Sequence, residues 1–192
     1  MARLDYKRSE DVDADAQALF AEIAGTRGRI GPLYQMVMNS PEIARGWFAM
    51  GNAVRLRAKL DGKLRELAIL LVGYLLQADY EYSHHYPFAL RNGASAEQLA
   101  ALPDFETSPL FDERERDVLR FAKVSTLEVV VPDAVYEAAR RHFDPQEMVE
   151  LAATVGFYNM VCRVIHALGI ELEPGVPSRL ATRPSYGPRF PG

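Results

Sequence analysis

The sequence predicts an all-α protein. Apolar residues recur at helical spacing along most of its 192 residues, and several of these segments begin with a residue that caps helices well. Only residues 127–131 are rich in β-branched residues, and one short run cannot build a sheet. The apolar share of 48% and the charged share of 25% are those of an ordinary globular domain. We therefore expect a bundle of about seven to eight helices.

The N-terminal part is expected to form two helices joined by a break. The first should span residues 13–23, followed by a glycine-rich break at 25–32 and a short segment at 33–38. Ser40 and Pro41 are a favourable start for the next helix, with serine as N-cap and proline in the first helical position. That helix should turn four apolar side chains inward: Ile43, Trp47, Met50 and Val54.

Two central helices are expected next. Asp61 can cap a helix that is apolar on nearly all sides, which indicates a position in the middle of the bundle. A second helix should run from Asp79, as its N-cap, to Arg91, and Gly93 supplies its left-handed end. The core face of the first of these helices is expected to consist of Leu64, Leu67, Ala68, Leu70 and Leu71.

The C-terminal half contains further helix signals as far as residue 168. Ser95 can open a short helix that stops before Pro103, and longer helices are expected at 112–125, 132–142 and 145–168. Asp144 should cap the last of them and Gly169 should end it.

The final residues differ in composition from the rest. Residues 173–192 contain five prolines and three glycines, which prevents a helix. We expect a single helical domain at 1–172 and a Pro-rich C-terminal arm at 173–192, either loose or laid along a partner subunit.

Composition also excludes several classes of partner. The net charge of −4 and the interspersed charges argue against nucleic acid, which selects basic stripes. The longest uncharged apolar run, residues 67–78, is shorter than the roughly 20 residues that span a bilayer. The N-terminus lacks the apolar core of a secretory signal. We expect a cytoplasmic protein without a membrane partner.

Cys162 is the only cysteine, so no intrachain disulfide and no CxxC redox pair can form. The thiol lies in an apolar helical stretch, which favours a buried, inert cysteine over a reactive one.

The segment around Glu81 carries the clearest chemical signal. On a helix Glu81 lies one turn from both His84 and His85, so its carboxylate can orient an imidazole and raise its basicity, as a general base requires. The same spacing also fits an ordinary ion pair on a helix surface. Tyr82 and His84 are candidate contacts to a substrate in this segment.

Two further polar groups interrupt apolar helices. Glu66 heads the apolar central helix, where it can either serve in a site or merely complement the helix dipole. Asn159, Arg163 and His166 form a polar stripe on the last helix, which indicates a pocket lining or a subunit contact.

We expect no cofactor and no metal. Glu81 and His84 match one Glu-x-x-His half-motif of di-iron bundles, but those bundles need two.

These segments together resemble the carboxymuconolactone decarboxylase family, which includes the alkylhydroperoxidase AhpD-like proteins. The resemblance extends over roughly residues 15–172 and rests on RELAIL at 65–70, DYEYSHH at 79–85, ALRNGAS at 89–95, VGFYNMV at 155–161 and ALGI at 167–170, with GPLY at 31–34 and SPE at 40–42 upstream. It implies an AhpD-like helical bundle whose subunits assemble as homo-oligomers, as trimers or hexamers.

The resemblance also implies site residues. His85 matches the family histidine and Glu66 the family glutamate, whereas the two cysteine positions of the peroxidase branch fall on Ala78 and Glu81. On one straight helix Glu66 and His85 would lie about 28 Å apart. They can share a site only if the chain reverses near residues 77–79 or if two subunits form the site.

The leading hypothesis is a decarboxylase-like, cofactor-free enzyme for a small organic acid or lactone. His85 would move the proton, Glu81 or Glu66 would set its protonation state, and Arg163 would hold a substrate carboxylate. If His85 is a pocket residue with few packing partners, His85→Gln should change stability by no more than about 1 kcal/mol.

Two alternatives stay open. One is a peroxiredoxin or alkylhydroperoxidase-type antioxidant activity, which would have to use Cys162 alone. The other is a non-catalytic, ligand-binding subunit of the same fold.

Overall fold

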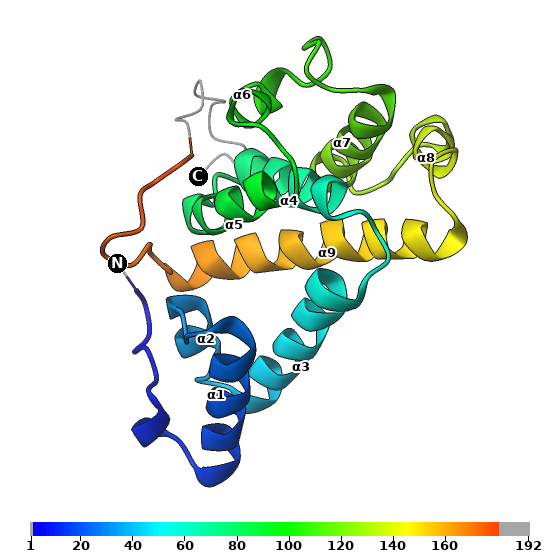
Figure 1. The fold of residues 1–192 in the computed structure, drawn as a ribbon. Helices are drawn as coiled ribbons and strands as arrows, with labels where there is room; N and C mark the ends of the chain where they lie inside the picture. Colours follow the sequence, from blue (N-terminus) through cyan, green and yellow to red (C-terminus); the bar gives the residue numbers. More distant parts are fainter. Residues whose placement is uncertain (1, 181–192) are drawn as a thin grey trace.

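The structure is a computed structural model that describes residues 2–180, and it is all-α as predicted (Figure 1). No strand is present in this range. Seven helices have seven residues or more, in agreement with the expected number, and α2 and α6 are shorter. The helices are α1 (Ala14–Arg27), α2 (Pro32–Val37), α3 (Pro41–Asn52), α4 (Gly62–Leu76), α5 (Asp79–Arg91), α6 (Ala96–Ala100), α7 (Glu113–Leu127), α8 (Asp133–Arg140) and α9 (Pro145–Leu168).

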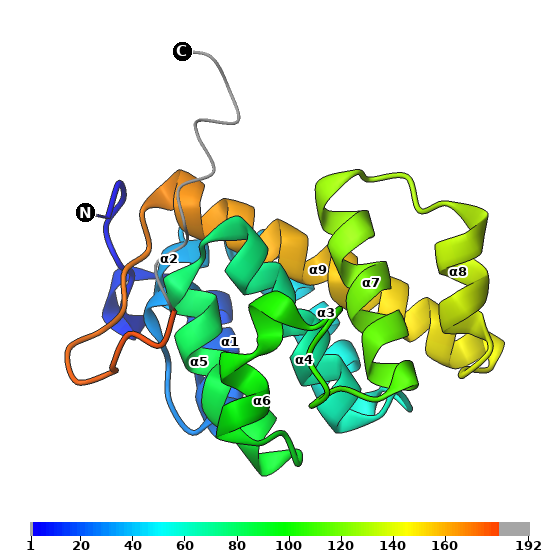
Figure 2. The same cartoon turned by 90° about the horizontal axis from the view of Figure 1, so that it is seen from above.

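Helix α4 is the centre of the bundle, as its apolar sequence predicts. Helices α5, α7 and α9 pack around it, and its predicted core face is buried. In Figure 1 the long α9 runs across the molecule, with α1, α2 and α3 on one side and α5, α6 and α7 on the other; Figure 2 shows the bundle from above. By length and composition alone α9 could cross a membrane, but half of its apolar window is buried inside the protein, as in a core helix.

Most helix ends follow the predicted capping. The carboxylates of Asp61 and Asp144 accept N–H groups of the first turns of α4 and α9, and α9 ends at Gly169 with φ of 64°. The prediction for Asp79 was wrong, since Ala78 is the N-cap of α5. Asp79 is the first residue of the helix, and its carboxylate accepts a hydrogen bond from Ser83 Oγ at 2.7 Å.

The buried face of α3 is rotated from the predicted one. Ile43 is 60% exposed and Met50 38% exposed, whereas Trp47 and Phe48 are both buried. The two adjacent aromatic rings determine the orientation, because Trp47 packs against Phe157 of α9 and Phe48 against Tyr34 of α2. Burying both rings turns the two aliphatic side chains outward.

The β-branched run at 127–131 forms no strand. Helix α7 ends at Leu127, and Val129 and Val130 lie exposed in the loop to α8. Val129 has a φ of 67°, which strains a β-branched residue.

Helices α4 and α5 form an antiparallel hairpin with a tight turn. Gln77 ends α4 in the left-handed conformation with φ of 56°, and the Ala78 N–H donates to Gly73 O at 2.9 Å. At Gly73 the backbone of α4 approaches Tyr82 of α5 so closely that an added Cβ would lie 3.5 Å from it. The reversal predicted at residues 77–79 therefore exists, and it brings Glu66 and His85 together within one subunit.

The turn at Gln77 gives a test of this hairpin. A β-branched residue costs about 1–2 kcal/mol in the left-handed region, whereas glycine adopts it freely. We expect Gln77→Val to lower the free energy of unfolding by that amount and Gln77→Gly to leave it unchanged or raised. Urea denaturation of the three proteins checks this. Equal stability of the valine and glycine variants would contradict the observed turn.

Candidate active site

His85 lies between two carboxylates. Its Nδ1 donates to Glu66 Oε2 at 2.6 Å, and its Nε2 lies 3.0 Å from Glu81 Oε1. Glu66 comes from α4, whereas Glu81 and His85 lie one turn apart on α5. All three side chains are buried, with 2%, 4% and 4% of Glu66, Glu81 and His85 exposed. Arg65 Nε contacts the second oxygen of Glu66 at 3.3 Å. These contacts form a buried acid–base triad.

The electrostatics favour a charged imidazolium. Burial works against the charge of His85, but Glu66 and Glu81 outweigh it and raise the pKa of His85. Burial likewise opposes the charge of Glu66, but His85, Arg65 and Arg55 outweigh it and lower the pKa of Glu66. These shifts favour a protonated His85 beside an ionised Glu66.

A cavity of about 600 Å³ borders one end of this triad. Glu81 and His85 line it, and Glu66 lies behind His85 on α4. Aromatic rings of Tyr34 and Phe88 form part of the wall. The cavity therefore reaches the acid–base groups from the Glu81 side.

Arginines surround the cavity. Arg55 lies in a π-helical turn at Ala53–Arg57, a conformation that recurs at functional sites. Its guanidinium lies 4.6 Å from the centre of the Phe88 ring, and Arg91 lies 4.4 Å from the same ring. Arg27, the last residue of α1, and Arg29, which follows the helix, also line the cavity. Positive charge of this kind favours an anionic ligand.

His84 belongs to another wall of the same cavity. Its Nδ1 lies 2.7 Å from Tyr80 O, and its Nε2 lies 3.2 Å from Glu173 Oε1. Glu173 also forms an ion pair with Arg29. Of the three histidines predicted for the site, His84, His85 and His166, only His85 contacts the carboxylates of the triad.

The C-terminal arm lies along its own subunit as far as the structure describes it. The Arg179 N–H donates to Ser83 Oγ at 2.8 Å, the Leu180 N–H to Asp79 Oδ1 at 3.3 Å, and Val176 lines the cavity. The described part of the arm therefore contacts α5 of its own subunit, and the expectation of a loose or partner-bound arm stays a prediction. Residues 181–192 lie outside the described range.

The other predicted substrate contacts do not line this cavity. Asn159 Nδ2 donates to Thr126 Oγ1 at 2.9 Å, Arg163 Nη1 donates to Asn159 Oδ1 at 2.6 Å, and His166 Nε2 lies 2.8 Å from Leu76 O. Tyr82 is buried, and its hydroxyl lies 3.5 Å from Leu99 O. The role of these four residues in substrate binding stays a prediction.

Three residues near the triad were missed by sequence reasoning. Tyr158 packs its ring edge-on to His85 with centres 4.9 Å apart, and burial raises its pKa well above the usual value. Arg27 and Arg55 line the cavity. Arg27 was missed because a basic residue in the last turn of a helix is commonly explained by the helix dipole. Arg55 was missed because a π-helical turn has no simple sequence signal.

Cys162 is fully buried in α9, as predicted. Burial raises the pKa of its thiol well above the usual value, with a further contribution from Glu81. The side chain is therefore a protonated thiol at neutral pH.

Within residues 2–180, no group of three or more His, Cys, Asp or Glu side chains is arranged to hold a metal ion.

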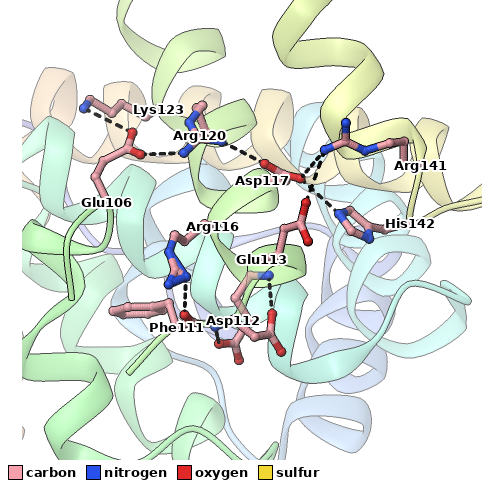
Figure 3. Close-up of polar contacts among 11 residues, drawn as sticks. Glu106, Phe111, Asp112, Glu113, Arg116, Asp117, Arg120, Lys123, Arg141 and His142 are labelled. Atoms are coloured by element: carbon pink, nitrogen blue, oxygen red, sulfur yellow. Dashed lines mark hydrogen bonds and ion pairs between the residues drawn. The ribbon is translucent and has the colours of Figure 1, made fainter. Parts of the chain in front are cut away.

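A second polar cluster lies away from the cavity, between α7 and α8 (Figure 3). Asp117 is buried, and its oxygens contact Arg120 at 2.8 Å, His142 at 3.0 Å and Arg141 at 3.4 Å. Glu106 pairs with Arg120 at 2.7 Å. The carboxylate of Asp117 is already paired with two arginines and an imidazole, so this cluster ties α7 to the end of α8.

The fold and the site together define an all-α protein with a buried acid–base triad beside a cavity. Residues 41–124, which include the whole triad, match the sequence model of the carboxymuconolactone decarboxylase family. The predicted resemblance to this family is therefore confirmed, and the chain, with Cys162 as its only cysteine, has no CxxC pair.

Individual relatives agree with this assignment. The uncharacterized protein YnjA of Escherichia coli (strain K12) is 28% identical over 125 residues, which are 65% of this chain and 69% of YnjA. The alkylhydroperoxidase AhpD core of an uncharacterized peroxidase-related protein from Ralstonia eutropha JMP134 superimposes with a TM-score of 0.77 and 20% identity, covering 90% of this chain and 93% of that one. The debrominase Bmp8, in complex with 2,3,4-tribromopyrrole, gives a TM-score of 0.74 and 18% identity, covering 90% and 91%. At these identities the two structures show the fold alone.

The buried position of His85 changes the expectation for its removal. His85→Gln leaves Glu66 and Glu81 in the interior without their cation, and breaking a buried ion pair costs about 3–5 kcal/mol. We therefore expect that loss at neutral pH, in place of the cost of no more than about 1 kcal/mol predicted from the sequence.

The pH dependence follows from the raised pKa of His85. Its contribution is fully present below the unfolded pKa of about 6.5 and is lost as the pH rises through the folded pKa. The difference in unfolding free energy between the wild type and His85→Gln should therefore shrink toward alkaline pH. Urea denaturation at several pH values checks this, with His84→Gln as the partly exposed control. A difference that stays constant across the range would show that His85 is not charged.

Proposed function

We propose that the protein is a cofactor-free acid–base enzyme of the carboxymuconolactone decarboxylase type, acting on a small organic acid or lactone. The observation that carries the proposal is the triad of Glu81, His85 and Glu66 at the wall of an arginine-lined cavity. An acid–base function needs a proton source that a ligand can reach, and Glu81 and His85 border the cavity. The family resemblance supports the same reaction class.

The two contacts of His85 divide the roles within the triad. Because both ring nitrogens face carboxylates, His85 has no free nitrogen for a substrate. In the proposed reaction Glu81 is therefore the group that meets the substrate, and His85 supplies it with a proton through Nε2. Glu66 stays ionised and stabilises the imidazolium through Nδ1, and Arg65 in turn stabilises Glu66.

The proposed reaction needs a proton to be delivered to a carbon atom of the intermediate that remains after CO2 is lost. When a β,γ-unsaturated lactone acid loses CO2, the carbon–carbon bond breaks and its electron pair passes into the conjugated system as an enolate. Glu81, protonated by His85, then delivers a proton to carbon, and solvent restores the proton of the triad. Arg55, which lowers the pKa of Glu66 and lines the cavity, is placed to offset the developing negative charge.

Peroxide reduction is the second family activity, and the site gives it little support. A thiol peroxidase needs a thiolate that peroxide can reach, whereas Cys162 is buried with a raised pKa. Glu81 stands where the resemblance puts one cysteine of the peroxidase branch, so a carboxylate replaces the thiol at that point.

The decisive variant is Glu81→Gln, because glutamine keeps the size and the hydrogen-bonding oxygen but cannot carry a proton. We expect it to lower the turnover of carboxymuconolactone, or of another lactone acid found by screening, by about 10²-fold or more. Release of CO2 measures the reaction. Cys162→Ser serves as the control and should keep the wild-type rate.

Three outcomes would contradict this proposal. Undiminished turnover in Glu81→Gln would remove Glu81 from the chemistry. Loss of turnover in folded Cys162→Ser would favour the thiol mechanism. Absence of turnover with every lactone acid, together with ligand binding, would support a non-catalytic subunit.

We propose also that the chain forms a homo-oligomer, a trimer or hexamer as the family resemblance implies. The support is apolar surface: Ile43 and Met50 of α3 and Val149 and Met160 of α9 are 38–68% exposed. Assembly that brings these side chains against a second subunit would remove their apolar surface from water.

Light scattering at micromolar concentration should give the mass of an oligomer. We expect Ile43→Glu, at a position 60% exposed, to weaken assembly with less than about 1 kcal/mol effect on subunit folding. A stable monomeric wild type would contradict the proposal.

A further inference from the structure

Arg27 has an unusual environment for a cation. It ends α1 and lines the cavity, with its guanidinium carbon 5.6 Å from the centre of the Phe48 ring. Both Nε and Nη2 are buried, and neither has a hydrogen-bond partner within the part of the chain that the structure describes. Arg27 as a whole is half-buried, but buried N–H groups are nearly always paired, so these two donors are unusual.

Two neighbouring arginines have acidic partners within the protein, since Arg65 contacts Glu66 and Arg29 pairs with Glu173. Arg55 and Arg91 instead stack on the Phe88 ring. Arg27 differs from all four because two of its buried nitrogens lack an acceptor. Arg27 lines the cavity, so a small rotation of its side chain would bring these nitrogens to an acceptor on a ligand there.

The two free nitrogens also specify the shape of the acceptor. In a guanidinium group, the Nε–H and one Nη2–H point in the same direction along one edge, and a planar carboxylate matches them with two parallel hydrogen bonds. Near this edge lie the Tyr34 hydroxyl and the Phe157 ring, since an added Cβ at Gly51 would meet Arg27 Nη2 at 3.4 Å, the Tyr34 hydroxyl at 3.6 Å and Phe157 at 3.7 Å. An aromatic or unsaturated body fits such surroundings.

Arg27 and Glu81 of the triad both affect the pKa of Tyr158. Burial is the main reason for the raised pKa of Tyr158, and Glu81 adds to the rise while Arg27 opposes it. Both groups thus lie within electrostatic reach of one phenol, whose ring packs against His85. A carboxylate at Arg27 would leave the rest of a small ligand beside Glu81.

We infer that the Nε–Nη2 edge of Arg27 is a carboxylate-binding subsite of the cavity, and that it selects planar, unsaturated or aromatic carboxylates. This deepens the proposed function by naming the group that anchors the ligand, and it rests on that function only for the reaction that follows binding. It assigns to Arg27 the role that the sequence suggested for Arg163, which lies outside the cavity lining.

Calorimetric titration with benzoate tests the subsite without any turnover. Benzoate should bind the wild type, and Arg27→Gln should weaken its affinity at least tenfold, as expected for the loss of two charge-assisted hydrogen bonds. Arg27→Lys should also weaken it, because a lysine keeps the charge but lacks the two-pronged edge. Arg45→Gln, at an exposed position of α3, is the matched control and should bind like the wild type. Circular dichroism confirms that each variant is folded.

Two further ligands define the chemistry. Benzamide has the same ring and no charge, and should bind far more weakly than benzoate; inorganic phosphate reports a general anion site. The inference is overturned if benzoate fails to bind the wild type at millimolar concentration, if it binds folded Arg27→Gln equally well, or if phosphate binds more tightly than benzoate.

Glu81→Gln separates this inference from the proposed function. If benzoate binding depends on Arg27 while Glu81→Gln leaves turnover unchanged, the subsite holds and the proposed proton transfer fails. If Glu81→Gln abolishes turnover while Arg27→Gln binds benzoate normally, the reaction stands and the subsite fails.

Discussion

The hydrogen bonds from His85 to Glu66 and Glu81 join the two central helices at the point where the chain buries its charges. A buried carboxylate is costly, and two of them become tolerable here because one imidazolium lies between them and Arg65 stands behind. The position of these charges depends in turn on the short α4–α5 turn, which aligns the start of one helix with the end of the other. Glu81 and His85 then form part of the cavity wall, and Tyr158 of α9 packs edge-on against His85.

Much of this arrangement could be read from the sequence. The apolar pattern of α4 predicted a central helix, and Asp61, Asp144 and Gly169 marked helix ends that the structure confirms. These features are local, because caps and periodicity act within a few residues. The outward turn of Ile43 could not be predicted, because the contact of Trp47 with Phe157 joins segments far apart in the chain.

The residues of the candidate site also differ in how far the sequence could predict them. His85 and its neighbour Glu81 share a helix, so spacing alone suggested their contact, whereas Glu66 needed both the family resemblance and the hairpin turn. Arg27 could not be recognised, because the property that distinguishes it is the absence of a partner within the described part of the chain. The contacts of the arm with α5 could not be predicted for a related reason: its prolines exclude a helix, but they do not specify which acceptors its backbone N–H groups will contact.

The residues that line the cavity come from different parts of the chain. The triad, Arg55 and Phe88 lie within the matched region 41–124, whereas Arg27, Arg29 and Tyr34 precede it and Val176 follows it. The matched region therefore supplies the triad and part of the cavity wall, and the segments before and after it complete the wall. A change in Arg27 or Val176 can alter the shape and charge of the cavity while the contacts of His85 with Glu66 and Glu81 stay as they are.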